Sequence, residues 1–252
     1  MISIFIMFSN DRELQLNLTL KNLKAMNGFN QCQLTIVSDG KCKVRDYDVV
    51  QVPRIDKFCW ADMWNAGVAT AKHDQIWYLD SDRLLPTNYI ELLKDAVVDD
   101  VFCFTSRHFL MLKQLDYSVC EEFLKTNQKA RINAIDHLKY EPRFGKVTHT
   151  PKKNVMSGNT AFTKKTYYKL GGVDRWYKGH GAFADNDFHN AATIAGCKFI
   201  DFEVPELHCY HDKKEGNKTL TNKELNLLAL ENYKYYCKKW NLPDSYWQSF
   251  KV

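Results

Sequence analysis

Two aspartates, Asp80 and Asp82, close the apolar run "IWYL" and are well placed by sequence to hold a cation. Side chains alternate along a strand, so both carboxylates are expected on one side and Ser81 on the other. Charge at the end of a buried strand is costly unless a cation or hydrogen bonds neutralise it. Paired hard oxygen ligands suit Mg²⁺ or Mn²⁺, which share their coordination with substrate phosphates. A helix cap or an ion pair with Arg83 is the alternative that position alone leaves open.

The spacing Asp-x-Asp carries little information by itself, because it occurs three times in this chain. Asp46 and Asp48 lie in the charged stretch "KVRDYD", which predicts solvated surface carboxylates. Asp185 and Asp187 follow a glycine-rich segment and precede an alanine-rich helix. Such glycines would let backbone and carboxylates approach a ligand closely. The alternative for Asp187 is an acid of the first helical turn, where the helix dipole favours negative charge.

Asp39 and two histidines, His208 and His211, complete the candidates. Asp39 ends the strand-like run "LTIVSD" and would accept a hydrogen bond from a nucleobase or ribose, or else form a simple turn. The histidines share a face if the backbone turns helically there. One imidazole among carboxylates favours Mn²⁺ over Mg²⁺, although histidine pairs of this kind are more often structural.

Alternating strands and helices in the first hundred residues must position these side chains. The runs "SIFIMF", "QLTIVS", "VVQVP" and "QIWYLDSD" predict four strands, the last continuing through Asp82. Helices are predicted after Asn10, with Glu13 completing a capping box, and over residues 61–72. An open α/β sheet follows, in which ligands bind at the carboxyl ends of the strands.

The pattern becomes less regular after residue 105. Residues 106–150 are interpreted as a variable insertion over the sheet edge, 151–220 resume with glycine-bearing, strand-like sequence, and 221–252 contain a C-terminal helix. These parts form one domain over 1–252 in the simplest partition. The bases between Lys125 and Lys153 would suit an anionic partner, although a solvated basic face explains such runs equally well.

Composition is that of an ordinary globular protein with a sizeable core. The chain has 252 residues, of which 45% are apolar, and a formal net charge of +5. Its eight cysteines form no CxxC pair, which predicts free thiols rather than disulfides or a zinc site. There is no basic leader and no apolar run of membrane-spanning length, so we expect a soluble, cytoplasmic protein.

Four stretches taken together resemble the GT-A fold nucleotide-sugar glycosyltransferases, in the branch similar to β-1,4-galactosyltransferases and chondroitin polymerases. "LTIVSDG" resembles the nucleotide-binding strand end, and "FCWADMWNAGVATAKHDQIWYLDSDRLLP" resembles a helix followed by the Asp-x-Asp strand. "MSGNTAFTKKTYYKLGGVDRWYKGHGAFADNDF" resembles the acceptor and catalytic region, and residues 208–214 the metal-histidine segment. The resemblance implies an α/β, Rossmann-like open mixed sheet flanked by helices, with a C-terminal helical appendage. It makes 1–105 the nucleotide-binding half and 151–220 the acceptor and catalytic half.

The resemblance also implies a role for each matching residue. Asp82 and His211 would bind the metal, Mn²⁺ or Mg²⁺, and His208 lies where some members place a second histidine. Asp80 would assist at the ribose or through water, and Asp185 would be the catalytic base. The predicted substrate-binding residues are Asp39, Asn65, Asp80, Gly158, Asn159, Trp176, His180, Asn186 and Asp187.

Two positions depart from the family pattern. Ala184 stands where a glutamate usually precedes the base, and "HGAF" replaces the usual Trp-Gly-Gly. We expect His180 either to supply a polar contact that tryptophan cannot or to be exposed. Both changes bear on the preference for donor or acceptor.

The implied reaction is an inverting transfer of a sugar from a nucleoside diphosphate sugar, with UDP favoured, to a hydroxyl of a glycan or other polymer. A sugar-phosphate nucleotidyltransferase is a weaker alternative, because "FSNDRE" lacks a glycine- and arginine-rich phosphate loop. A polyanion-binding protein without catalysis is another alternative. The third is a viral or phage transferase that glycosylates a modified nucleic-acid base in the host cytoplasm. The donor sugar, the acceptor and the oligomeric state are left open by the sequence.

Overall fold

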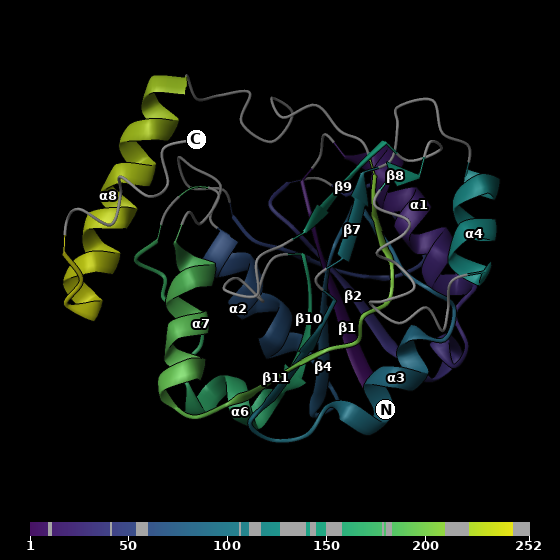
Figure 1. Ribbon diagram of the computed structural model, residues 1–252, viewed down its shortest axis with the longest axis horizontal. Coiled ribbons are helices and arrows are strands. Elements are labelled where there is room, and N and C mark those ends of the chain that lie inside the picture. The colour runs from purple at the N-terminus through teal and green to yellow at the C-terminus, as the bar shows by residue number, and fades with distance from the viewer. Residues whose placement is uncertain are drawn as a thin grey trace.

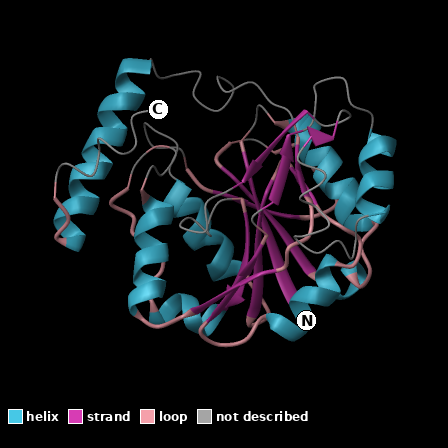
Figure 2. Cartoon of the chain, in the orientation of Figure 1, coloured by secondary structure: helices cyan, strands magenta, loops and turns pink. Residues whose placement is uncertain are grey.

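Strand β1 (Ile2–Phe8) is buried along its whole length inside a seven-stranded sheet. Its alternate side chains enter two different cores: Phe5 packs into one, and Ile4 and Ile6 into the other. A strand that is apolar at every position needs cover on both faces. Helices supply that cover on either side of the sheet (Figures 1 and 2).

The computed structural model describes residues 1–9, 12–40, 42–53, 60–105, 107–110, 117–126, 140–141, 145–149, 158–177, 179, 183–209 and 222–243. Seven of the eight cysteines lie in these ranges, and all seven are free thiols, as predicted. Among the helices in these ranges, none combines the length and apolar character needed to cross a bilayer.

The large sheet is mixed, with the strand order β11-β6-β10-β4-β1-β2-β3. Its other strands are β2 (Gln33–Ser38), β3 (Asp48–Gln51), β4 (Gln75–Asp80), β6 (Val101–Phe104), β10 (Asn159–Thr163) and β11 (Lys198–Asp201). β1 pairs in parallel with β2 and β4, whereas β10 is antiparallel to both β4 and β6. The predicted open mixed sheet is confirmed. One boundary was wrong, because β4 ends at Asp80 and Asp82 lies in the turn that follows.

Two groups of helices cover the sheet. On the Phe5 face lie α2 (Trp60–Thr70), α6 (Lys164–Lys169), α7 (Ala184–Ile194) and α8 (Asn222–Trp240). On the other face lie α1 (Glu13–Lys24) and α3 (Tyr89–Ala96). The short 3-10 helix η1 (Phe29–Gln31) follows α1, and α4 (Tyr117–Thr126) packs in a smaller third cluster. The predicted cap Asn10 lies outside the described residues.

A second, smaller sheet lies at the carboxyl end of β4. Its order is β5-β12-β7-β9-β8. The strands are β5 (Arg83–Leu84), β7 (Arg107–Leu110), β8 (Tyr140–Glu141), β9 (Gly145–His149) and β12 (Glu206–His208). The region predicted as an insertion, 106–150, supplies β7, β8 and β9 of this sheet. β5 follows β4 after a two-residue turn, so the small sheet brings distant segments to the edge where ligands bind in open α/β sheets.

Replacing Gly67 by alanine tests how closely α2 packs on β1. A Cβ at this position would lie 2.3 Å from Cδ2 of Phe5, whose ring is enclosed by Trp64 and Tyr78. Helix propensity alone would make Gly67→Ala stabilising by about 1 kcal/mol. Because the ring has no room to move, we expect a loss of about 1–3 kcal/mol in the free energy of unfolding, measured in urea. Ala69→Gly, at an exposed position of the same helix, reports the propensity effect alone. A Gly67→Ala protein more stable than wild type would contradict this packing.

Candidate active site

The turn that carries Asp82 is held in place by buried polar side chains of α1. Thr19 Oγ1 lies 3.0 and 3.1 Å from two carbonyl oxygens of this turn and shares its proton between them. Asn22 donates to the carbonyl oxygen of Leu85 at 3.0 Å and accepts from its N–H at 2.8 Å. These bonds satisfy buried backbone groups of residues 81, 83 and 85, in and just after the turn. α1 therefore fixes the backbone immediately after β4.

Three nitrogen-bearing side chains converge on the carboxylate of Asp82, which is 1% exposed. Arg12 Nη1 lies 2.7 Å and His208 Nε2 3.3 Å from the same oxygen, Oδ2. Arg83 Nε lies 3.3 Å from Oδ1. Burial by itself raises the pKa of Asp82, but His208, Arg83 and Arg12 together outweigh burial and hold the pKa well below its usual range. The guanidinium groups of Arg83 and Arg12 thus favour the ionised carboxylate, which is the form that binds a metal.

Asp80 is the last residue of β4 and lies in a different environment. The Tyr78 hydroxyl donates to Oδ1 of Asp80, and Arg83 Nη2 lies 3.9 Å from Oδ2. Burial, and then the neighbouring charge of Asp82, raise the pKa of Asp80. Its side chain is still 28% exposed. Both aspartates contact Arg83, in keeping with the expectation that they lie on one side. Asp82 lies in the turn after β4, however, and not in the strand as predicted.

A buried ion pair between Arg83 and Glu206 fixes the guanidinium beside the two aspartates. Arg83 Nη1 lies 2.7 Å from Oε1 of Glu206, which is fully buried. Asn159 donates to Oε2 of Glu206 at 2.9 Å and accepts from Trp77 Nε1 at 2.7 Å. Gly158 leaves room for the guanidinium: a Cβ there would lie 2.7 Å from Arg83 Nη2, and the φ of +87° also favours glycine.

Strand β12 brings His208 to this carboxylate. In the antiparallel pairing of β12 with β5, His208 lies opposite Arg83. The N–H of Cys209 donates to the carbonyl oxygen of Asp82 at 2.8 Å and so joins the end of β12 to the turn after β4. Within the described ranges no group of three or more His, Cys, Asp or Glu is arranged around a metal position. A carboxylate oxygen and an imidazole nitrogen 3.3 Å apart nevertheless fit a divalent ion that completes its coordination with water and phosphate.

The second acidic stretch forms the first turn of α7. Asp185 and Asn186 are partly exposed there, whereas Asp187 is 3% exposed. Lys239 Nζ lies 2.8 Å from Oδ2 of Asp187, and Trp240 Nε1 donates to Oδ1 at 2.7 Å. Asp187 thus ties α8 to α7. Its predicted role in binding substrate stays a prediction beside this structural one.

Asn65, Trp176 and Asp39 lie on three other elements. Asn65 in α2 donates to the carbonyl oxygen of Val173 at 2.8 Å and so joins α2 to the segment before α7. Trp176 is 43% exposed and stacks on Tyr235 of α8 with the ring centroids 3.9 Å apart. Asp39 follows β2 and is buried. Their predicted roles in substrate binding stay predictions.

The structure gathers some of the predicted residues and adds two that sequence reasoning missed. Asp80, Asp82 and Gly158 lie against the Arg83 guanidinium. Asn159 donates to Glu206, the partner of Arg83, and His208 contacts Asp82. Those outside the described residues are His180 and His211. The residues that were missed are Arg12 and Glu206. An acid inside the apolar run "VPELHC" was the available signal for Glu206, and a base directly after the first strand was the signal for Arg12.

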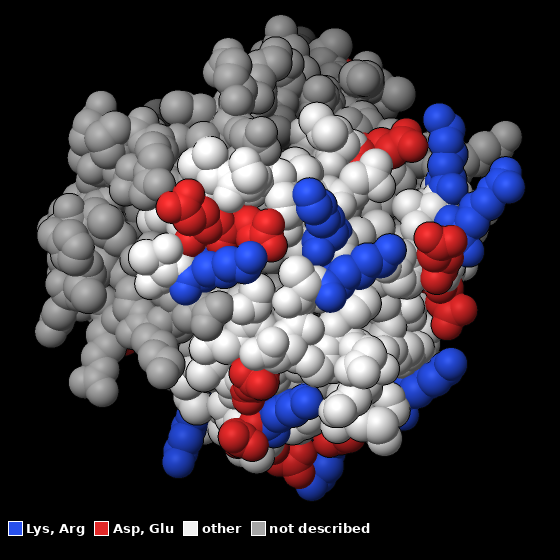
Figure 3. Space-filling view, turned by 90° about the vertical axis from the view of Figure 1, so that its right-hand side faces the viewer, with Lys and Arg blue, Asp and Glu red and all other residues white. Residues whose placement is uncertain are grey.

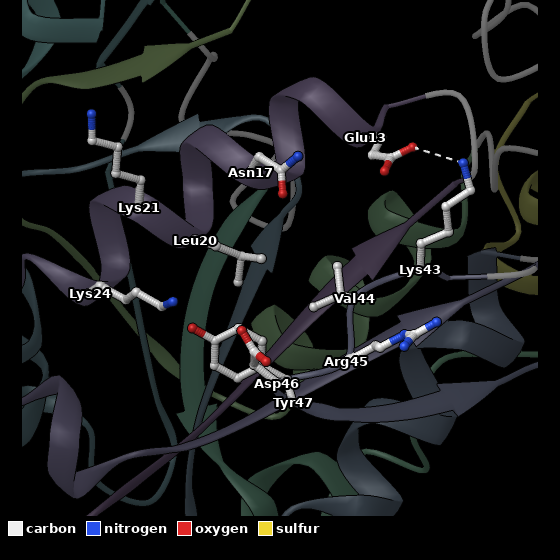
Figure 4. A pocket seen from close by; sticks show the side chains of 10 residues that line it. All are labelled: Glu13, Asn17, Leu20, Lys21, Lys24, Lys43, Val44, Arg45, Asp46 and Tyr47. Atoms are coloured by element: carbon white, nitrogen blue, oxygen red, sulfur yellow. Dashed lines mark ion pairs between the residues drawn. The ribbon is translucent and has the colours of Figure 1, made fainter.

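A pocket of about 480 Å³ runs along α1 beside residues 42–47 (Figure 4). Its charged lining residues are Glu13, Lys21, Lys24, Lys43, Arg45 and Asp46. Lys43 lies 3.7 Å from Glu13, and Lys24 lies over the ring of Tyr47. On the face of the molecule at the right of Figure 1, acidic and basic side chains are interspersed (Figure 3). This described surface carries no patch of a single sign, and most of the basic segment 125–153 lies outside the described residues.

The chain is similar to known proteins in sequence and in fold. No family model matches the chain. A chondroitin synthase from Escherichia coli is 29% identical over a stretch that covers 63% of this chain and 26% of that protein. The chain therefore spans about a quarter of the length of this curated relative.

Two solved structures share the fold. One is a crystal structure of GalNAc-T7 with UDP, GalNAc and Mn²⁺, at a TM-score of 0.61 and 12% identity, covering 94% of this chain and 47% of that one. The other is the mannosyltransferase PcManGT from Pyrobaculum calidifontis in complex with GDP-Man and Mn²⁺, at a TM-score of 0.53 and 10% identity, covering 94% and 64%. The GT-A fold that the sequence motifs predicted is thereby confirmed.

The Arg83–Glu206 ion pair predicts a large stability effect for a very small change. Glu206→Gln keeps the size of the side chain but removes the buried carboxylate that lies nearest the Arg83 guanidinium, at 2.7 Å against 3.3 Å for Asp82. Breaking a buried pair in this way costs about 3–5 kcal/mol. We expect the midpoint of thermal unfolding to fall accordingly. Glu231→Gln, the same replacement at an exposed position of α8, is the control and should change stability by less than about 0.5 kcal/mol. Equal unfolding midpoints for the two variants would show that the pair does not support the fold.

Proposed function

We propose that this GT-A fold chain is a metal-dependent, inverting glycosyltransferase. It would move a sugar from a nucleoside diphosphate sugar, with UDP favoured, to a hydroxyl of a glycan or other polymer. The observation that carries the proposal is the pairing of ionised Asp82 with His208 Nε2 at 3.3 Å, at the end of β4. The Mn²⁺ and nucleotide-sugar complexes of the two similar structures support it.

The donor side of the proposed site uses residues at the ends of β2 and β4. Asp82 and His208 would hold the divalent ion, which when bound acts as a Lewis acid on the departing diphosphate. Asp80 reaches solvent beside Asp82 and would contact the ribose directly or through water. Asp39, after β2, would accept a hydrogen bond from the nucleobase or ribose. Arg83 contacts both aspartates and would hold them in place, so that little reorganisation of the carboxylates is needed when the donor binds.

The acceptor side would use the start of α7. Asp185 is partly exposed in the first turn of this helix, where the dipole favours a negatively charged side chain. There it would take the proton of the acceptor hydroxyl as that oxygen attacks the anomeric carbon. Trp176, exposed and stacked on Tyr235, offers a flat apolar surface of the kind on which sugar rings pack. Orientation of donor and acceptor in line would supply much of the remaining rate enhancement.

Screening nucleotide sugars for Mn²⁺-dependent hydrolysis identifies the donor and tests the proposal as a whole. Release of the free sugar from one nucleotide sugar, abolished by EDTA, is the expected result. Pyrophosphate production from a nucleoside triphosphate and a sugar phosphate would instead support a nucleotidyltransferase. Salt-sensitive binding of nucleic acid, unchanged by loss of Asp82 or Asp185 and without turnover, would support a polyanion-binding protein. Sugar transfer together with nucleic-acid binding would support a nucleic-acid base as the acceptor.

Asp82→Ala removes the proposed carboxylate ligand of the metal. We expect Mn²⁺-dependent UDP binding to weaken by more than about tenfold. Even mutation of a residue that only hydrogen bonds to a metal ligand commonly lowers metal affinity by that factor. Isothermal titration with UDP, with and without Mn²⁺, measures this effect. Asp48→Ala alters the second Asp-x-Asp motif at an exposed position and should bind as wild type does. Mn²⁺-dependent binding that survives in Asp82→Ala would reject the metal assignment.

Asp185→Asn removes the proposed base and keeps the shape of the side chain. Donor binding should be unchanged, while kcat falls by roughly 10²–10⁴-fold, the usual contribution of a well-placed general base. Asp95→Asn, at an exposed position of α3, is the matched control. Normal turnover in Asp185→Asn, measured in the same preparation as its donor affinity, would rule out Asp185 as the base.

A further inference from the structure

We propose that Arg12 is an exchangeable cation that closes the metal site in the resting protein. In this inference, which rests on the proposed function, the Arg12 guanidinium occupies the carboxylate oxygen that the divalent ion needs. Binding of the ion then exchanges one cation for the other.

The geometry at Asp82 Oδ2 carries the first step. Arg12 Nη1 lies 2.7 Å from this oxygen, and His208 Nε2 lies 3.3 Å from the same atom. Arg12 therefore contacts the oxygen that Asp82 would share with His208 in holding an ion. The guanidinium places a positive charge at this oxygen and takes up one of its lone pairs, so it competes with a divalent ion for Oδ2.

The electrostatic balance gives the second step. Asp82 is buried, and two guanidinium groups already face its two oxygens, Arg12 at Oδ2 and Arg83 at Oδ1. An incoming divalent ion would add two positive charges to this neighbourhood. Departure of Arg12 removes one positive charge and restores most of the attraction between Asp82 and the ion.

The anchoring of the two arginines shows which one moves. Arg83 is held by the buried carboxylate of Glu206 at 2.7 Å and is only 8% exposed. The Arg12 side chain is 22% exposed, and in the part of the chain that the structure describes its hydrogen bond runs to Asp82. Its Nε is buried and, among the described residues, has no hydrogen-bond partner. Displacing Arg12 thus breaks one ion pair, whereas displacing Arg83 would break its contacts with Glu206, Asp82 and Asp80 together.

The backbone of Arg12 allows its side chain to move alone. The N–H of Arg12 donates to the carbonyl oxygen of Ser9 at 3.0 Å, and its own carbonyl oxygen accepts from the N–H of Leu16 at 2.9 Å. These bonds tie the main chain to β1 and α1. The side chain makes no cap for α1, so its release leaves the helix start intact.

The test measures Mn²⁺ affinity without nucleotide, by electron paramagnetic resonance of the free ion, in wild type and Arg12→Ala. Loss of the competing ion pair should tighten Mn²⁺ binding by roughly tenfold or more, because a charge-assisted hydrogen bond is no longer broken on binding. Arg12→Lys, which keeps the charge, should lie between the two. Arg45→Ala makes the same change in net charge at an exposed position and should bind Mn²⁺ as wild type does.

A second readout comes from thermal unfolding. In EDTA, Arg12→Ala should unfold at a lower temperature than wild type, because Asp82 has lost a counter-charge. Added Mn²⁺ should raise the unfolding temperature of Arg12→Ala by more than it raises that of wild type. Equal Mn²⁺ affinity in wild type and Arg12→Ala would overturn the role of Arg12 and leave the proposed function standing. Absence of Mn²⁺ binding in every variant, even with UDP present, would instead reject the metal site itself.

Discussion

The buried negative charge of Asp82 is the constraint on which the rest of this site depends. A carboxylate that is 1% exposed must be compensated, and Arg12, Arg83 and His208 surround it. Arg83 in turn needs Glu206, and Glu206 needs Asn159. A chain of charges and hydrogen bonds thus extends from a solvent-facing edge into the core. Each member of it compensates the charge or the polar group of a neighbour.

The same constraint explains why a helix and a second sheet meet at the end of β4. Residues 81–85 form no part of the large sheet, so Thr19 and Asn22 of α1 satisfy their backbone groups. β12 adds His208 from the far end of the chain and pairs with β5. α1, β4 and β12 are therefore held to one another by polar contacts at this edge, while the apolar cores hold the layers behind it.

Much of the fold was predictable because it rests on local patterns. Unbroken apolar runs identified β1, β2 and β4, since parallel strands covered on both faces need apolar residues at every position. The seven scattered cysteines that the structure describes are free thiols, as predicted. The end of β4 was misplaced, because the turn after Asp80 is bonded to Thr19 on another element, a contact that residues 80–82 alone do not reveal.

The site was predictable only in part, because its main contacts join residues that are far apart in the sequence. Arg12 and Asp82 are 70 residues apart, and Arg83 and Glu206 are 123 apart. No local period connects residues at such separations. The alternative of an ion pair with Arg83 was correct as a contact, since Arg83 lies 3.3 Å from Asp82 and 3.9 Å from Asp80. Asp187 belongs to a motif that suggested a role at the active site, but its carboxylate bonds Lys239 and Trp240 and so anchors α8.

A crystal grown with Mn²⁺ and UDP, with anomalous diffraction recorded at the manganese edge, tests the central claim most directly. The account predicts an anomalous peak within coordination distance of both Asp82 and His208, beside the diphosphate, with the Arg12 guanidinium no longer bonded to Asp82. UDP bound with Arg12 still on Asp82 and manganese absent from that carboxylate would contradict it.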